Sequence, residues 1–274
     1  MSSNSERRYT TLIHRASNKY PNWDPEVTVE AGDWGRIIDG RTGKWLPRRS
    51  RGGIFLKEGN IYKDGIAEEY DIPEPIVYGA EAADGVSWVV SKHTRAWNVS
   101  AEAASQTPAL AHYDVKARYH FSSNGGAILA MQNDSISRID PPGKLRRLLD
   151  EERMHDCVIV SEVHHCSSYA RYLSSRGTKD VVIGLSAEPA IPGIAAAHAH
   201  LEWVHSATTG NFKSKVSLNG SRDFCPLFRL VSLKDSDVSV GLRGASDGPV
   251  PPLPDAELPW SDEEDCVEND IAEE

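Results

Sequence analysis

Apolar and charged side chains alternate strictly over residues 113–121 of this chain. A period of two is that of a β-strand with one apolar face and one charged face. Residues 122–126, Ser-Ser-Asn-Gly-Gly, favour a chain reversal, and the apolar residues 127–131 follow. The pattern predicts an amphipathic hairpin whose first strand carries on its apolar face Tyr113, Val115, Ala117, Tyr119 and Phe121.

A second alternation occupies residues 195–204, where apolar side chains include Ala199, Leu201 and Trp203. Together with the β-branched run at 157–163, it predicts a second hairpin within residues 158–205. One amphipathic hairpin is explained by a half-exposed sheet. Two of them also fit strands that are stored in a soluble form and later inserted into a membrane, with the charged face toward water. Alternation alone favours the half-exposed sheet, because such sheets are common, and the presence of two hairpins shifts the balance toward membrane insertion.

The remaining pattern predicts helices at residues 1–20 and 144–154, and a last apolar strand at residues 224–233. The expected fold class is therefore α+β, a twisted antiparallel sheet with extended amphipathic hairpins and flanking helices. Beyond the last strand the chain is rich in proline, glycine and acidic residues. We expect a body at residues 1–233 and a flexible acidic tail at residues 234–274.

Charge separates the same two parts. The chain has 30 Lys and Arg against 40 Asp and Glu, a net charge of −10. Residues 234–274 contain 2 of the basic and 13 of the acidic residues, so the body is nearly neutral. Within the body, residues 36–63 hold 8 basic and 2 acidic residues. A cationic patch and an anionic tail in one chain predict either a solubilising tail or a mask over the patch.

Anionic lipid is the expected partner of this basic surface, and nucleic acid is not, because the total charge is negative and few aromatic residues lie near the patch. A helix with a basic stripe and a turn that joins tryptophan and leucine to several cations are typical of interfacial binding. The candidate lipid-binding residues are Arg7, Arg8, Arg15, Lys44, Trp45, Leu46, Arg48, Arg49 and Arg51.

Candidate catalytic chemistry is sparse. His198, His200 and Glu202 would share one face of a strand and could hold a metal ion. Additional ligands could come from Glu162, His164, His165 and Cys166. The sequence has neither an HExxH helix nor paired CxxC motifs, and polar strand faces collect histidines without binding metal. We expect no catalytic residue, no metal and no cofactor, with a metal-dependent enzyme and a non-enzymatic β-rich binding module as alternatives.

No apolar run approaches the ~20 residues of a transmembrane helix, and residues 1–8 lack the apolar stretch of a secretory signal. The four cysteines show no CxxC spacing, as expected of reduced thiols in the cytoplasm. These features predict a cytoplasmic location for the inactive protein.

Three segments resemble the gasdermins, particularly the shorter fungal-type members. Residues 158–163, Val-Ile-Val-Ser-Glu-Val, are similar to a gasdermin strand that follows a helix. Residues 227–231, Leu-Phe-Arg-Leu-Val, resemble the strand that closes the pore-forming domain, and residues 45–49, Trp-Leu-Pro-Arg-Arg, resemble a turn that touches lipid. The resemblance covers roughly residues 5–233 and is carried by order and spacing.

The resemblance implies an autoinhibited monomer with a gasdermin N-terminal-domain-like fold. Once activated, it would bind cardiolipin, phosphatidylserine or phosphoinositides, form a homo-oligomer and insert its hairpins as a β-barrel pore that kills the cell. In place of the large repressor domain of animal members, only residues 234–274 are available here for inhibition. Activation by a protease and by an allelic partner both remain open, and the expected cleavage region contains Gly241, Pro249 and Pro254.

Overall fold

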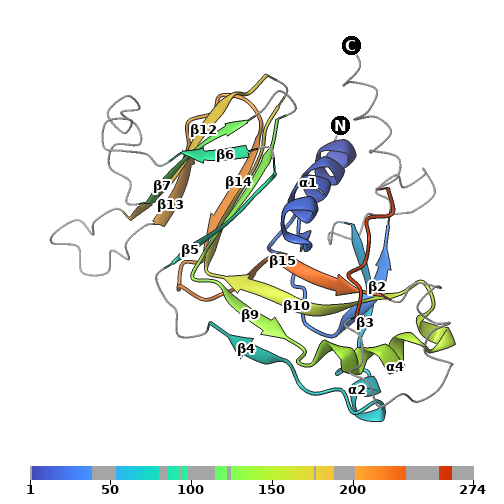
Figure 1. The fold of residues 1–274 in the computed structure, drawn as a ribbon. Helices are drawn as coiled ribbons and strands as arrows, with labels where there is room; N and C mark the ends of the chain where they lie inside the picture. Colours follow the sequence, from blue (N-terminus) through green and yellow to red (C-terminus); the bar gives the residue numbers. More distant parts are fainter. Residues whose placement is uncertain are drawn as a thin grey trace.

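The computed structural model describes residues 2–38, 54–79, 85–92, 94–97, 115–121, 125–175, 177–187, 201–232 and 253–260 (Figure 1). These parts of the chain form mostly antiparallel β-sheet with few helices, which agrees with the expected α+β class. Across the described residues, no helix combines the length and the apolarity needed to cross a membrane.

The described helices are α1 (Ser2–Ser17), α2 (Ile66–Glu69) and α4 (Arg146–Leu149), and 3-10 turns at Pro142–Leu145 and Glu152–Met154 flank α4. The predicted helix at residues 1–20 is therefore confirmed, whereas the single helix predicted at 144–154 is wrong. The helix is interrupted because Glu151 has an extended backbone with ψ 140°. The interruption still leaves Leu148 and Met154 buried.

A seven-stranded antiparallel sheet forms the base of the molecule, with the order β1-β15-β10-β2-β3 and with β9 and β4 added beside β10. It contains β1 (Tyr20–Pro21), β2 (Asp33–Ile37), β3 (Phe55–Asn60), β4 (Ile76–Tyr78), β9 (Ser135–Arg138), β10 (Val158–Cys166) and β15 (Phe224–Val231). The predicted buried strands at 157–163 and 224–233 are β10 and β15, the most extensively paired strands of this sheet.

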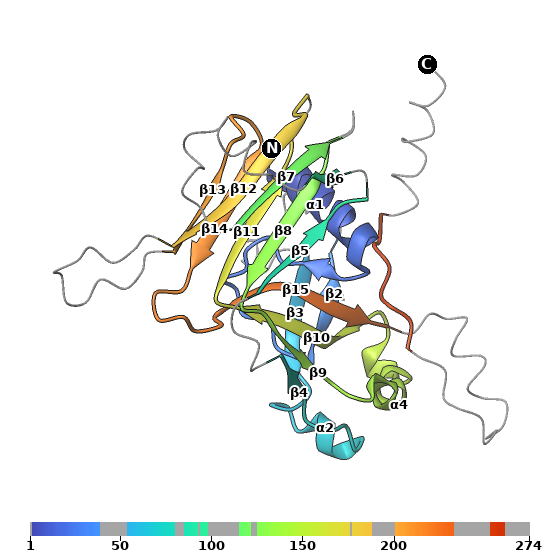
Figure 2. The same ribbon diagram turned by 60° about the vertical axis from the view of Figure 1, so that its left-hand side comes forward.

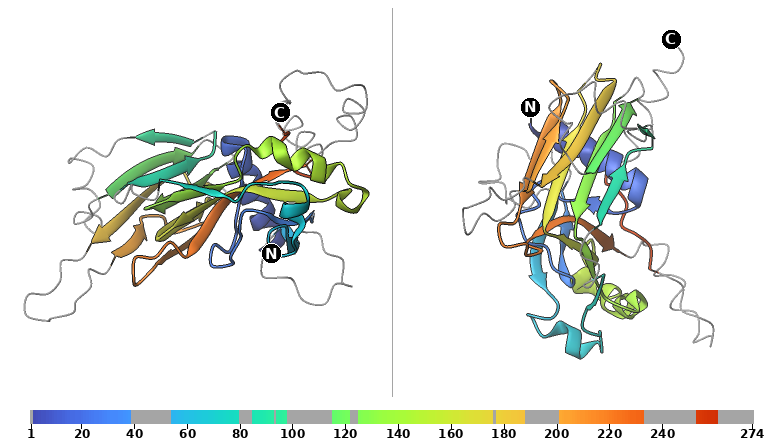
Figure 3. Two further views of the ribbon diagram at one scale, coloured as in Figure 1. Left: turned by 90° about the horizontal axis from the view of Figure 1, so that it is seen from below. Right: turned by 90° about the vertical axis from the view of Figure 1, so that its left-hand side faces the viewer.

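Two four-stranded antiparallel sheets stand on this base (Figures 2 and 3). The first, the inner sheet, contains β5 (Val86–Val90), β8 (Ala127–Gln132), β11 (Ser168–Leu173) and β14 (Asn211–Val216). The second, the outer sheet, contains β6 (Thr94–Trp97), β7 (Val115–Phe121), β12 (Asp180–Ala187) and β13 (Leu201–His205). Their orders are β14-β11-β8-β5 and β13-β12-β7-β6.

Four layers follow one another across the upper part of the molecule in Figure 1. The outer sheet comes first, the inner sheet second, α1 third, and the C-terminal segment Leu253–Trp260 last. Apolar side chains between the two sheets form one core, and apolar side chains between the inner sheet and α1 form another.

Candidate functional site

Two long β-hairpins together form both four-stranded sheets. Each hairpin bends between the two sheets, so that one half of it belongs to the inner sheet and the other half to the outer sheet. The first hairpin runs through β5 and β6 and returns through β7 and β8, with β6 paired to β7 and β5 paired to β8. The second runs through β11 and β12 and returns through β13 and β14. The hairpins lie side by side, because β8 pairs with β11 and β7 pairs with β12.

This arrangement corrects both predicted hairpins. Residues 113–121 and 127–131 were expected to pair across a reversal at 122–126, but β7 and β8 belong to different sheets. Residues 125–126 lie where the chain crosses between the sheets. The second hairpin comprises residues 168–216 instead of 158–205, because residues 158–166 belong to the seven-stranded sheet. A period of two identified the strand faces but not the strand partners.

In the second hairpin, the bend brings the two ends of the return path together. Trp203 of β13 donates a hydrogen bond from its indole nitrogen to Ser168 Oγ at 3.1 Å. Ser168 is in turn the register partner of Val216 on β14. The two strands of the return path, β13 and β14, are therefore folded back against one another across the bend.

Aromatic side chains fill the space between the two sheets. The Trp88 ring lies 5.6 Å from Tyr119 and 6.0 Å from Trp203, and the Phe121 ring lies 5.9 Å from Tyr172. Such contacts add to the free energy gained by apolar burial. Tyr119, Phe121 and Trp203 are each at most 3% exposed.

The predicted membrane-facing residues thus include much of this core. Tyr119, Phe121 and Trp203 are buried, and Ala117 is half-buried against the same cluster. Val115 and Leu201 lie in β7 and β13, with side chains outside the described set. Tyr113 and Ala199 lie outside the described residues. A charge at Tyr119 would therefore disrupt the fold itself.

Two glycines permit the crossing between sheets. Gly125 has φ +75°, which non-glycine residues rarely adopt, and a Cβ there would lie 2.3 Å from Ser174 Oγ. The backbone nitrogen of Gly126 donates to the same hydroxyl at 2.6 Å. A Cβ on Gly126 would lie 2.5 Å from the Phe121 ring. The sequence Gly-Gly, interpreted above as a hairpin turn, is required here by close packing at the bend.

Helix α1 covers the face of the inner sheet that points away from the outer sheet. Tyr9 and Ile13 are fully buried there, in one cluster with Leu129, Met131 and other residues of the sheet. This face also holds a buried cation that the sequence analysis did not single out, Arg171 of β11. Its guanidinium carbon lies 3.6 Å from the Trp23 ring centroid, and one nitrogen donates to Asn211 Oδ1 at 2.9 Å.

The segment Leu253–Trp260 packs into the body, although it belongs to the part of the chain expected to be a flexible tail. Ala256 donates its backbone N–H to Leu230 O at 2.9 Å, and Asp255 forms an antiparallel bridge with Val231. Its apolar side chains are 1–6% exposed, namely Leu253, Ala256, Leu258 and Trp260. Scattered apolar residues in an acidic stretch were the available signal. Pro254, expected in the cleavage region, is half-buried here, while Gly241 and Pro249 lie outside the described residues.

Trp260 connects this segment to α1. Its indole N–H donates to Thr11 Oγ1 at 2.9 Å, and the Arg7 guanidinium carbon lies 4.8 Å from its ring centroid. The cation–π geometry places Arg7, a predicted lipid-binding residue, against the segment. Arg8 donates to Ser174 O at 3.3 Å, and Arg15 is half-buried. The other predicted lipid-binding residues, Lys44, Trp45, Leu46, Arg48, Arg49 and Arg51, lie outside the described part of the chain.

Ion pairs and a hydrogen bond connect the second hairpin to the turn after β1. The Lys213 ammonium lies 2.8 Å from a carboxylate oxygen of Asp24 and 2.8 Å from one of Glu26. Tyr169 on β11 donates its hydroxyl to Glu26 at 2.7 Å. Partial burial raises the pKa of Glu26, but the hydrogen bonds from Lys213 and Tyr169 outweigh it and lower the pKa to about 2.

A second polar network joins the residues that follow α1 to the base sheet and the first hairpin. Lys19 is ion-paired with Glu162 on β10 and lies 2.7 Å from His164 Nε2. His164 Nδ1 is 3.4 Å from Asp134, which accepts a hydrogen bond from Ser87 at 2.8 Å. Burial raises the pKa of Glu162, yet the hydrogen bonds of His164 and Lys19 lower it to about 2. The carboxylate is therefore charged at neutral pH.

The metal hypothesis draws no support from the described residues, among which no group of three or more His, Cys, Asp and Glu side chains is arranged to hold an ion. Of its three proposed ligands, Glu202 is exposed on β13, and His198 and His200 lie outside the described ranges. His165 contacts Cys225 Sγ at 3.3 Å, and burial raises the pKa of that thiol.

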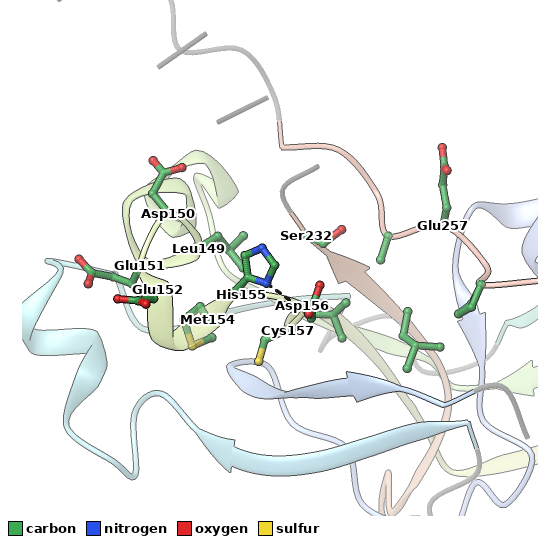
Figure 4. A pocket seen from close by; sticks show the side chains of 14 residues that line it. Leu149, Asp150, Glu151, Glu152, Met154, His155, Asp156, Cys157, Ser232 and Glu257 are labelled. Carbon is green, nitrogen blue, oxygen red and sulfur yellow. Dashed lines mark ion pairs between the residues drawn. The ribbon is translucent and has the colours of Figure 1, made fainter. Parts of the chain in front are cut away.

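An acidic pocket lies between the turn at 150–158 and the docked C-terminal segment (Figure 4). His155 is paired with the neighbouring Asp156 at 3.2 Å. The carboxylates that line the pocket belong to Asp150, Glu151, Glu152, Asp156 and Glu257. Cys157 and His155 both line the pocket, and burial raises the pKa of the Cys157 thiol, which disfavours the reactive thiolate.

No protein-family model matches this chain, and no curated protein is significantly similar to it in sequence.

Proposed function

We propose that this chain is an autoinhibited pore-forming protein of the gasdermin type, which binds acidic lipids, oligomerises and inserts its two hairpins into a membrane. The observation that carries the proposal is the identical strand order of the inner and outer sheets. Because every strand keeps the same neighbours on both sides of the bend, opening the bend would give one long four-stranded sheet without exchanging a single strand pair.

The length and the parity of such a sheet suit a barrel. Residues 115–132 would span about 60 Å when extended at ~3.3 Å per residue, whereas a barrel strand crosses the bilayer with about 9–11 residues. Four strands per copy keep all pairs antiparallel when the outer edge of one copy meets the next. The resemblance of β10 and β15 to gasdermin strands adds support, since these two strands are paired neighbours.

The resting state would be maintained by the layer that covers the hairpins. Helix α1 buries the free face of the inner sheet, and the C-terminal segment holds α1 through Trp260 and Thr11. The same contact engages Arg7, so lipid binding by α1 and docking of the segment would compete for one side chain. We propose that cutting the connection leaves the segment bound in solution, and that anionic lipid competing for Arg7 then displaces it.

We expect cleavage within residues 233–252 to cause dye release from vesicles containing cardiolipin or phosphatidylserine. A site-specific protease sequence would replace residues 241–246, and the cut and uncut proteins would be compared on anionic and on neutral vesicles. We expect leakage only from the cut protein and only with anionic vesicles, because the docked segment would cover part of the basic surface and anionic lipid would bind to that surface.

Absence of leakage from a cut protein that has released its segment and kept its fold would contradict pore formation. That result would favour the alternative, a non-enzymatic β-rich binding module in which the bent sheet is permanent. Leakage from both cut and uncut protein would retain the pore and transfer its control to a partner molecule.

A further inference from the structure

The C-terminal segment occupies the edge of β15 in the way an added strand occupies a sheet. On this edge, β1 covers only Leu227 and Phe228. Farther along, Leu230 O accepts the N–H of Ala256 at 2.9 Å, and Ser232 N–H donates to Pro254 O at 3.4 Å. Backbone pairing of this kind provides affinity that does not depend on sequence, while side-chain pockets provide specificity.

Side-chain sites beside this edge fit the segment closely. Leu253 packs in a cluster with Ile159 and Val231, whereas Leu258 and Trp260 pack in another with Tyr20. The Tyr20 hydroxyl donates to Ala256 O at 3.0 Å. Charge adds a further contact, because the Arg229 guanidinium donates to Asp255 Oδ2 at 3.1 Å.

Residues 233–252 connect the segment to the body, and the described residues Ser232 and Pro254 on either side of this connection are hydrogen-bonded to each other. All the contacts described above are made by residues 253–260 themselves. A covalent connection raises the effective concentration of the segment at its site.

We propose that the edge of β15 beside α1 is a peptide-binding groove, whose ligand is an extended peptide with the pattern of Leu253–Trp260, and that it binds this peptide in trans once the connection is cut. The ligand class is defined by two leucines, a small residue, an aspartate opposite Arg229 and a terminal tryptophan. Another copy of the same chain could supply it. This binding goes beyond the proposed function, because it requires neither lipid nor pore formation.

The experiment uses the full chain carrying the replaced site at 241–246, cut by its protease. Size-exclusion chromatography is expected to show the two fragments eluting together, and a labelled peptide of residues 250–262 should exchange into the groove, as measured by fluorescence anisotropy. The Trp260→Ala peptide should bind at least about thirtyfold more weakly, because Trp260 is the largest buried anchor. The matched control is Glu257→Gln, at an exposed position, which should bind within about fivefold of the unmodified peptide, because exposed charge interactions contribute at most about 1 kcal/mol.

Three results would overturn the proposal. The first is separation of the unmodified fragments on cutting while the near-UV circular dichroism of the body persists. The second is unfolding of the body when the segment leaves, because the segment would then be an inseparable part of the core. The third is an equal loss of binding for the Trp260→Ala and Glu257→Gln peptides. None of these measurements involves vesicles, so failure here and failure of pore formation are distinguishable.

Discussion

Replacing Trp260 with alanine is expected to lower the free energy of unfolding by about 3–5 kcal/mol and to make the uncut protein leak anionic vesicles. Trp260 is 1% exposed, and its loss would leave a cavity beside α1 and remove the hydrogen bond that Thr11 Oγ1 accepts. Urea denaturation measures the first effect and dye release the second. Because α1 covers the inner sheet, a looser α1 should favour opening of the bend.

The matched control for this prediction is Glu257→Gln in the uncut protein. Glu257 is exposed on the same segment, and a substitution there should change stability by no more than about 1 kcal/mol. A Trp260→Ala protein that is as stable as the parent would show that the segment contributes little to the fold. A destabilised variant that leaves vesicles intact would show that the segment stabilises the fold but does not control the pore.

The Glu162→Gln substitution is expected to cost about 3 kcal/mol of stability at neutral pH, because the folded state holds the pKa of this carboxyl near 2 instead of 4.5. A lowered pKa stabilises the folded protein above pH 4.5, and the contribution is lost as the pH falls from 4.5 toward 2. The difference in stability between parent and variant should therefore shrink over this range, as measured by urea denaturation at a series of pH values.

Glu202→Gln serves as the control for the second prediction, because Glu202 is exposed on β13. It should show neither the loss at neutral pH nor the acid dependence. A Glu162→Gln difference that stays constant between pH 7 and pH 2 would contradict the assignment of the loss to the ion pair with Lys19.

Much of the strand and helix content could be predicted from the sequence alone. Helix α1 was indicated by the spacing of Tyr9 and Ile13, and both residues are fully buried. Strands β10 and β15 were indicated by runs of apolar residues, which strands buried on both faces require. Local patterns of this kind depend on the periods of helix and strand, which the sequence displays directly.

The pairing of strands could not be obtained in the same way. Residues 125–126 have the composition of a turn, and only the tertiary structure shows that they allow close contact with Ser174 and Phe121 at a bend. Likewise, β7 pairs with β12, whose residues are more than 50 positions away in the chain. A period-two pattern specifies which face is apolar but not which strand lies alongside.

The docking of residues 253–260 could not be predicted from their composition. Residues 253–260 lie in a stretch dominated by acidic residues and proline, where Leu258 and Trp260 are separated by Pro259. Such composition is typical of a disordered tail. Their burial depends on an open edge of β15 and on Thr11 of α1, which are distant in sequence.

The most direct test of the central claim is the distance between residues 202 and 218, measured by pulsed electron spin resonance with labels on unnatural amino acids, so that the native cysteines remain. Both positions are exposed. In the resting fold, the contact of Trp203 with Ser168, the register partner of Val216, places the start of β13 near the end of β14. On anionic vesicles, the cut protein should show a distance near 50 Å, since the 16-residue separation extends at ~3.3 Å per residue. A distance unchanged from that of the uncut protein in solution, under conditions of dye release, would contradict opening of the bent hairpins.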